Sequence, residues 1–171
     1  IYDAYDNADV LIAVGNGLKR EMENYTHNNI RVIHNMVDLS RFGNDNNKEI
    51  KKDDDTFSVF SCAFLEEGKG MENLIKAFSK AFKDKKAILK IGGDGSLTKK
   101  LKEMIKEEHM ENQIYLLGAL SRDEVAQEMK MCDSFVLASE HETFGVVYIE
   151  AMACGKPVIG TYNGGAEDII R

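Results

Sequence analysis

The sequence predicts an α/β fold in which helices cover both faces of a parallel β-sheet. The first observation is that short apolar runs alternate with segments of helical period along the 171 residues. The second is that helical segments of about 10 to 14 residues separate the apolar runs, as in repeated βαβ units. The third is the composition, because 43% hydrophobic and 30% charged residues are typical of a domain with a buried core. These observations predict a Rossmann-like sheet.

The first elements precede a break in this pattern. We expect a strand over residues 10–14, a helix over 16–25 and a strand over 30–34. Residues 35–55 are rich in Asn, Asp, Lys and Glu and have no apolar repeat, which is typical of an interdomain linker. We therefore assign residues 1–34 to the C-terminal tail of a second, truncated Rossmann-like domain, and residues 35–55 to the linker.

After the linker, strands and helices alternate to the end of the chain. We assign residues 56–171 to one domain, which we expect to be truncated at its C-terminus. Its helices have clear signals, since Leu74, Phe78 and Phe82 recur at helical spacing, and Ser121 with Glu124 fits a capping box. The expected strands are 57–62, 87–93, 113–118, 134–139 and 157–162, and the expected helices are 71–82, 96–109, 121–132 and 144–155.

Composition and charge argue against several classes of protein. No stretch approaches the ~18 uninterrupted apolar residues of a membrane-spanning helix. The cysteines, Cys62, Cys132 and Cys154, stand singly in apolar contexts, which predicts reduced core residues and a cytoplasmic protein. The net charge of -7 argues against nucleic-acid binding but is compatible with a small anionic ligand. We interpret the acidic run 53–55 as a solvated linker segment and assign no metal to it.

Glu150 is unusual because its neighbours on the predicted helix are apolar. Val146 and Val147 lie one turn before it, and Ala153 and Cys154 lie one turn after it. An ionised carboxylate that is buried without a partner costs several kcal/mol, so a partner is expected. One interpretation is a buried ion pair with a Lys or Arg, or a less buried helix. The other is a carboxylate that accepts hydrogen bonds from the two adjacent hydroxyls of a ribose, in a cleft at the carboxyl end of the sheet.

Glu142 lies in the loop between the expected strand 134–139 and the same helix. Ligands of open parallel sheets bind outside the carboxyl ends of the strands. The backbone N–H groups of residues 143–146 would be unsatisfied at a helix N-terminus, and together with the helix dipole they form an anion site. Gly145 would let a ligand approach the backbone closely. The alternative is that Glu142 only complements the helix dipole.

Two glycine-rich turns follow expected strands, at residues 67–70 and 92–96. The second lacks the third glycine of a dinucleotide-binding fingerprint. Lys69 in the first is more informative, because an ammonium group beside a tight turn suits a diphosphate, although it could also be an ordinary surface lysine. Two functions follow: an enzyme that uses a nucleotide diphosphate, or a non-catalytic nucleotide-binding module. A second glutamate near an anion favours the enzyme, which must also hold hydroxyl groups.

Glu142 and Glu150 are separated by seven residues, and this spacing resembles the E-x7-E motif of retaining glycosyltransferases of the GT-B fold, family 4-like (glycosyl transferases group 1). The similarity continues through the Gly164–Gly165 pair and Glu167. It includes the stretches VIHNMVD, KGMENLIKAF, GGDGSLTKKL, IYLLGALSRDEV and EAMACGKPVI. The resemblance implies the C-terminal, donor-binding domain of such an enzyme. One departure is Phe64, which stands where many relatives have an arginine.

The resemblance also implies a reaction. It implies a retaining hexosyltransferase that moves a sugar from a nucleotide diphosphate sugar to a hydroxyl of a saccharide or lipid-linked acceptor, without a metal or other cofactor. Polysaccharide or glycolipid assembly is the usual setting, and peripheral association with the inner face of the membrane through the missing domain is compatible with it. The alternatives are a sugar-nucleotide epimerase of the same fold and a non-catalytic module.

The implied catalytic residues are Glu142 and Lys69, and the implied donor-binding residues are Glu150, Thr143, Phe144, Gly145, Val146, Gly93, Gly95, Leu117 and Gly118.

Overall fold

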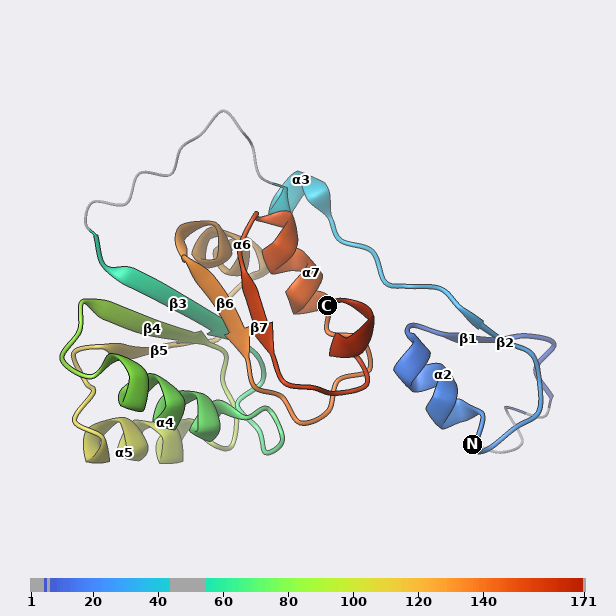
Figure 1. Ribbon diagram of the computed structural model, residues 1–171, viewed down its shortest axis with the longest axis horizontal. Helices are drawn as coiled ribbons and strands as arrows, with labels where there is room; N and C mark the ends of the chain where they lie inside the picture. Colours follow the sequence, from blue (N-terminus) through green and yellow to red (C-terminus); the bar gives the residue numbers. More distant parts are fainter. Residues whose placement is uncertain (1–4, 6, 44–54, 171) are drawn as a thin grey trace.

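The computed structural model describes residues 5, 7–43 and 55–170, and its strands form two parallel sheets. The smaller sheet pairs β1 (Leu11–Ala13) with β2 (Ile30–Val32), and α2 (Asn16–Met22) connects them. The larger sheet has the strand order β5-β4-β3-β6-β7 (Figure 1). Its strands are β3 (Phe57–Cys62), β4 (Ala87–Gly92), β5 (Ile114–Gly118), β6 (Ser134–Leu137) and β7 (Val158–Gly160).

Helices cover both faces of the larger sheet, which confirms the predicted α/β fold (Figure 1). One face carries α4 (Met71–Phe82) and α5 (Thr98–Glu107), and the other carries α3 (Leu39–Phe42), α6 (Arg122–Met131) and α7 (Val146–Ala153). A short 3-10 helix, η1 (Ala166–Asp168), follows β7. In the part of the chain that the structure describes, no helix is long and apolar enough to cross a membrane.

The observed elements lie close to their expected positions. Strand β3 and helix α4 have the predicted bounds, because apolar alternation and helical period are unambiguous there. Helix α7 begins at Val146 rather than near Phe144, because its N-cap, Gly145, has the left-handed φ of 84°. This conformation, which glycine adopts without a steric cost, sets the direction in which the helix starts.

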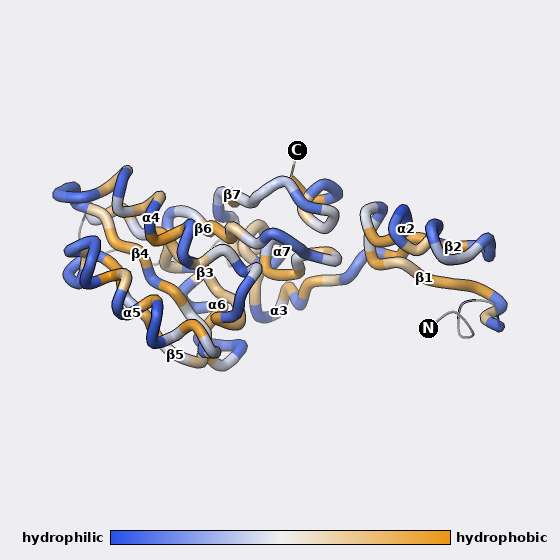
Figure 2. Tube along the Cα trace, turned by 90° about the horizontal axis from the view of Figure 1, so that it is seen from below, coloured by the Kyte–Doolittle hydropathy of each residue, from blue (hydrophilic) through white to orange (hydrophobic). Residues whose placement is uncertain are grey.

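The core of the larger domain lies between the sheet and its helices, and hydrophobic stretches alternate with hydrophilic ones along these elements (Figure 2). Phe60 of β3 and Phe135 of β6 make an edge contact with ring centroids 6.1 Å apart. Tyr148 of α7 packs edge-on against Phe135 and donates a hydrogen bond of 3.1 Å to the carbonyl of Leu137. Burial raises the pKa of Tyr148 to about 12. Helix α7 is therefore fixed to β6, the strand that precedes it.

The segment predicted as a linker contains α3, which packs against α6 and α7. Phe42 is fully buried there, and Arg41 forms an ion pair of 2.7 Å with Asp123 of α6. Lys130 donates a 2.7 Å hydrogen bond to the carbonyl of Arg41. Asp53 and Asp54 of the acidic run lie outside the described residues. The division of the chain at residues 34 and 55 stays a prediction.

Helix α2 lies against η1 and brings the small sheet next to the larger domain. Asn16 donates a 2.9 Å hydrogen bond from its side chain to Asp168, and Arg20 forms a 2.8 Å ion pair with Glu167. The backbones of Gly17 and Gly164 approach so closely that a Cβ atom at Gly17 would overlap the Gly164 carbonyl. These contacts join residues about 150 positions apart.

We expect Ser121→Ala to destabilise the chain by about 1 kcal/mol, because the Ser121 hydroxyl accepts the Glu124 N–H while the Glu124 carboxylate accepts the Ser121 N–H. Urea denaturation followed by circular dichroism measures this change. Ser121→Asp serves as the matched control, since aspartate is also a good N-cap and should cost little. Equal midpoints for Ser121→Ala and the parent chain would contradict a contribution of this cap to stability.

Candidate functional site

The strand order reverses at β3, because β4 pairs with one edge of this strand and β6 with the other. Such a switch point leaves a crevice at the carboxyl ends of the two strands. A cavity of about 570 Å³ lies there, within the usual size range of ligand pockets. It is lined by Asn35, Cys62, Ala63, Phe64, Lys69, Gly93, Asp94, Ala119, Leu120, Arg122, Val125, Leu137, Glu142, Thr143, Phe144, Gly145, Val146 and Val147.

Lys69 and Glu142 meet across this switch point. Lys69 follows β3 and Glu142 follows β6, and their side chains form a partly buried ion pair of 2.8 Å between Nζ and Oε1. The backbone N–H of Glu140 donates a 2.8 Å hydrogen bond to the carbonyl of Gly68, which ties the two loops together. Gly70 adopts a left-handed conformation against the carbonyl of Ala138, where a Cβ atom would overlap the oxygen. The loop backbone therefore positions the pair.

The N-terminus of α7 faces the same cavity. Thr143, Phe144, Gly145 and Val146 all line it. No side chain caps this helix end, and Gly145 turns the chain sharply into the first helical residue. Uncapped N–H groups and the positive end of a helix dipole form an anion site, and Lys69 adds a positive charge beside it. The structure thus brings together the two elements from which a phosphate site was predicted.

Glu150 has a different surrounding from that of Glu142. It is 0% exposed and does not itself line the cavity. Its Oε1 atom forms a close ion pair with Nη2 of Arg122, whereas its buried Oε2 atom has no hydrogen-bond partner among the residues that the structure describes. The structure therefore contains the ion pair of the first interpretation, at the edge of the cavity. A contact between Glu150 and a ribose stays a prediction.

Sequence reasoning did not single out Arg122, although this residue connects Glu150 with the cavity. Its side chain is 55% exposed, lines the cavity, and lies over the Phe42 ring with Cζ 4.9 Å from the ring centroid. The hydrogen bond that Arg122 donates to the Glu150 carboxylate raises the pKa of the Arg122 guanidinium above its usual range. A signal was present in the sequence, because a buried glutamate requires a cation and the capping box starts α6 next to this arginine.

The remaining predicted site residues divide into two groups. Gly93 lines the cavity, but Gly95, Leu117 and Gly118 are not among its lining residues. The Gly93 N–H donates a 2.7 Å hydrogen bond to the Gly118 carbonyl, so these two turns support one another. After β5 the wall is formed by Ala119 and Leu120, one to three positions beyond the predicted pair, because Gly118 turns the chain with a φ of 76°.

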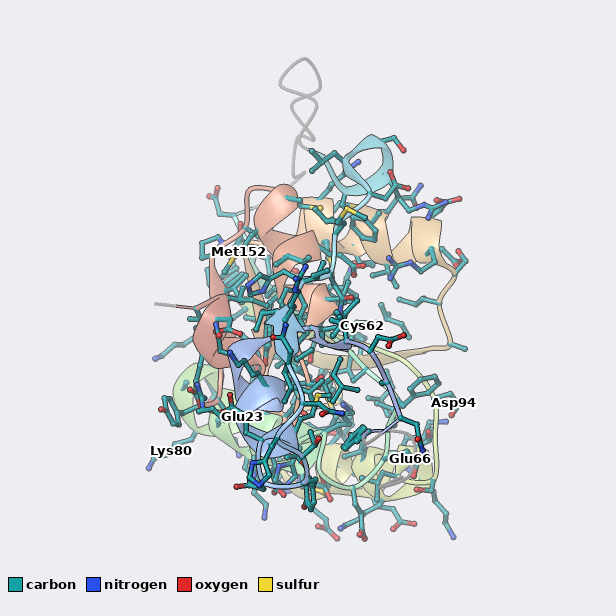
Figure 3. The ribbon with its side chains drawn as sticks, turned by 90° about the vertical axis from the view of Figure 1, so that its right-hand side faces the viewer. Glu23, Cys62, Glu66, Lys80, Asp94 and Met152 are labelled. Atoms are coloured by element: carbon teal, nitrogen blue, oxygen red, sulfur yellow. The ribbon has the colours of Figure 1, made fainter. Side chains whose placement is uncertain are left out.

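Cys62 and Phe64, at the carboxyl end of β3, also line the cavity and were not predicted as site residues. Phe64 is 78% exposed, at the position where the resemblance leads one to expect an arginine. Figure 3 shows Cys62 near the centre of this face, with Asp94 and Glu66 to one side. Burial, and secondarily the charge of Glu150, raise the pKa of the Cys62 thiol to about 11.

A second cavity of about 300 Å³ adjoins the first, and Glu142 and Thr143 line both. Its opposite wall comes from α2, through Gly17, Leu18 and Glu21. His141 also lines it and is exposed, as expected for a histidine in a surface loop. Within residues 5, 7–43 and 55–170, no group of three or more His, Cys, Asp or Glu side chains is arranged to hold a metal ion. Glu142 lies between the two cavities, because it lines both of them.

The family described as glycosyl transferases group 1 matches residues 43–171. This match spans most of the chain and includes both glutamates and Lys69. The fold agrees, since a parallel sheet with helices on both faces is the architecture of GT-B glycosyltransferases. The chain therefore belongs to the glycosyl transferases group 1 family.

Two relatives and one solved structure indicate how far the similarity extends. An uncharacterized glycosyltransferase of Methanocaldococcus jannaschii is 37% identical over 169 residues, which cover 98% of this chain and 44% of that protein. The N-acetyl-alpha-D-glucosaminyl L-malate synthase of Bacillus anthracis is 30% identical over 97% of this chain and 45% of the synthase. This chain thus spans somewhat under half the length of these relatives.

The solved structure is that of the Anabaena protein HepE in complex with UDP and glucose. It superposes with a TM-score of 0.81 and 24% sequence identity, covering 98% of this chain and 48% of that chain. At this level of identity the comparison supports the fold.

We expect Cys62 to react slowly with iodoacetamide at pH 8, because a pKa of about 11 instead of 9.0 reduces the thiolate fraction about a hundredfold. Peptide mass spectrometry after timed alkylation measures this rate. Glu150→Gln removes a negative charge near the thiol and should accelerate the reaction, whereas Glu128→Gln, which alters a glutamate outside the cavity lining, should not. Alkylation of Cys62 in the parent chain as fast as that of free cysteine would contradict the expectation.

Proposed function

We propose that this protein transfers a hexose from a nucleoside diphosphate sugar to a hydroxyl group of an acceptor, with retention of the anomeric configuration and without a metal ion. The observation that carries the proposal is the Lys69–Glu142 ion pair at the switch point, next to the N-terminus of α7. A cation and a helix N-terminus suit a diphosphate, and a carboxylate beside them suits the hydroxyl groups of a sugar. Family membership supports glycosyl transfer as the reaction.

We propose one orientation of the donor in the cavity. Its phosphates would accept hydrogen bonds from the backbone at Gly145 and Val146 and lie beside Lys69. Its ribose would lie toward Arg122 and Glu150, and its base toward the wall formed by Ala119 and Leu120. HepE, which has a similar fold, was solved with UDP and glucose, and this supports a uridine nucleotide as the first ligand to test.

The proposed chemistry gives Lys69 the main electrostatic role. When the bond between the anomeric carbon and the phosphate oxygen breaks, negative charge grows on the departing diphosphate, and Lys69 would stabilise that charge in the transition state. The anomeric carbon bonds to the acceptor oxygen, and the hydroxyl proton of the acceptor passes to the oxygen of the departing diphosphate. Retention requires the acceptor to approach the face from which the diphosphate departs. Glu142 would hold the sugar beside this point.

The second cavity suits the acceptor, because Glu142 lies between it and the donor cavity. A saccharide or lipid-linked acceptor in polysaccharide or glycolipid assembly is our proposal for the whole protein, at the inner face of the membrane. Family membership favours a transferase over an epimerase. The two glutamates favour an enzyme over a non-catalytic module, since a second carboxylate would repel the anion of a simple phosphate binder.

Glu150→Gln should weaken the binding of UDP by about 10- to 100-fold, because the loss of a charge-assisted hydrogen bond to the ribose costs roughly 1.5–3 kcal/mol. Isothermal titration calorimetry of the full chain with UDP, GDP and ADP identifies the preferred nucleotide and then compares the variants. Glu128→Gln is the matched control, since Glu128 forms a partly buried ion pair with Lys90 outside the cavity lining. Equal affinity of Glu150→Gln and the parent would exclude the ribose assignment.

Lys69→Met should weaken the binding of the same nucleoside diphosphate by about tenfold or more but leave the affinity for the parent nucleoside unchanged, since Lys69 acts on the phosphates. The same calorimetric comparison with UDP and uridine, or their counterparts, tests this. Lys90→Met is the matched control for loss of a paired lysine. Equal losses for nucleotide and nucleoside would show that Lys69 does not bind the diphosphate.

A further inference from the structure

We infer that Arg122 is the positioning residue for Glu150: it holds Oε1 and leaves Oε2 as the acceptor for a hydroxyl of the donor ribose. This inference rests on the proposed function and adds to it a residue that the E-x7-E motif does not contain. Arg122 begins α6 and Glu150 lies in the middle of α7, so two different helices contribute the pair.

The inference starts from the unequal surroundings of the two carboxylate oxygens. Oε1 is bound by the Arg122 guanidinium, whereas Oε2 is buried and has no hydrogen-bond partner within residues 5, 7–43 and 55–170. Burying a hydrogen-bond acceptor without a partner is unfavourable, so native structures rarely keep one without a reason. A ligand hydroxyl that donates to Oε2 would remove this cost. The Oε2 atom of Glu150 can therefore accept a hydrogen bond from a ligand.

Arg122 also has contacts other than Glu150 that hold it in place. Its Cζ atom lies 4.9 Å from the centroid of the Phe42 ring, a favourable position for a cation over an aromatic face. Phe42 is itself fully buried in α3, and the capping box of Ser121 and Glu124 fixes the first turn of α6. Because the guanidinium is restrained in this way, it can orient the carboxylate rather than merely neutralise it.

Arg122 also connects Glu150 with the cavity. It lines the cavity with a half-exposed side chain, while Glu150 is fully covered. A small displacement of the Arg122 side chain that preserves its bond to Oε1 would uncover the carboxylate without leaving a buried charge uncompensated. Lys69, in contrast, lies at the phosphate end beside Glu142. This division of roles predicts that Arg122 acts on the ribose through Glu150 and not directly on the phosphates.

The test uses the full chain with six variants: Arg122→Met, Arg122→Lys, Glu150→Gln, the double variant of Arg122→Met with Glu150→Gln, Lys69→Met, and Arg20→Met as control. Arg20 is a matched arginine, since it forms a 2.8 Å ion pair with Glu167 and is absent from the cavity lining. The probes are UDP, GDP and ADP, and the 2′,3′-dideoxy counterpart of whichever binds the parent chain. Calorimetry measures the dissociation constants, and thermal denaturation without ligand measures the stability of each variant.

We expect Arg122→Met to raise the dissociation constant of the ribonucleotide by about tenfold or more, and Arg122→Lys to retain most of the affinity. The loss should be absent for the dideoxy nucleotide and absent when Glu150→Gln is already present. Arg20→Met should leave both affinities unchanged. Without ligand, the melting temperature should fall in Arg122→Met and recover in the double variant, because removing one member of a buried pair costs more than removing both.

Two results would overturn the inference while leaving the proposed function intact, provided that Lys69→Met still loses diphosphate affinity. An equal loss for ribonucleotide and dideoxynucleotide would mean that Arg122 contacts the phosphates or the base directly. Tighter binding by Arg122→Met would mean that the guanidinium competes with the ligand for Glu150. A parent chain that binds none of the three nucleotides would instead overturn the proposed function and the role of Oε2. In that case the melting temperatures alone would report whether Arg122 and Glu150 stabilise one another.

Discussion

The ion pair between Lys69 and Glu142 depends on the reversal of strand order at β3, and the candidate site depends on that pair. The two residues are 73 positions apart, yet they are 2.8 Å from one another because β3 and β6 are adjacent parallel strands whose following loops emerge at the same edge. The contacts of Gly68 and Gly70 with the loop after β6 hold both backbones. A cation and a carboxylate are thereby presented together at a helix N-terminus.

Three helices contribute a second group of contacts beside this pair, in which Arg122 of α6 binds Glu150 of α7 and lies over Phe42 of α3. Helix α7 connects the Lys69–Glu142 pair with these contacts, because it follows the loop that carries Glu142 and contains Glu150 one turn after its first residue. The segment predicted as a linker thus has a structural role, since its Phe42 supports the arginine that holds the buried glutamate. The chemistry of the site is built on the packing of α3, α6 and α7.

Much of the fold could be predicted because its signals are local. The bounds of β3 and α4, and the capping box of α6, follow from residue patterns within a few positions of each other. The start of α7 was misplaced because the left-handed conformation of Gly145 is not visible in an apolar pattern. The small helix around Phe42 was missed because one buried residue in a polar stretch produces no periodicity. At the site, Lys69 and Glu142 were found because tight glycine turns and strand ends mark such positions.

Local sequence patterns were enough to distinguish strands from helices, to place Glu142 in the loop before a helix and Glu150 within that helix, and to show the resemblance to a family. Three features depend on tertiary packing instead: Glu150 pairs with Arg122, its second oxygen has no partner among the described residues, and Ala119 and Leu120 rather than Leu117 and Gly118 line the cavity. Helical and strand patterns are visible in the sequence because they arise from interactions between near neighbours. The partner of a buried charge depends instead on how α6 and α7 pack on the sheet, since Arg122 and Glu150 are 28 positions apart.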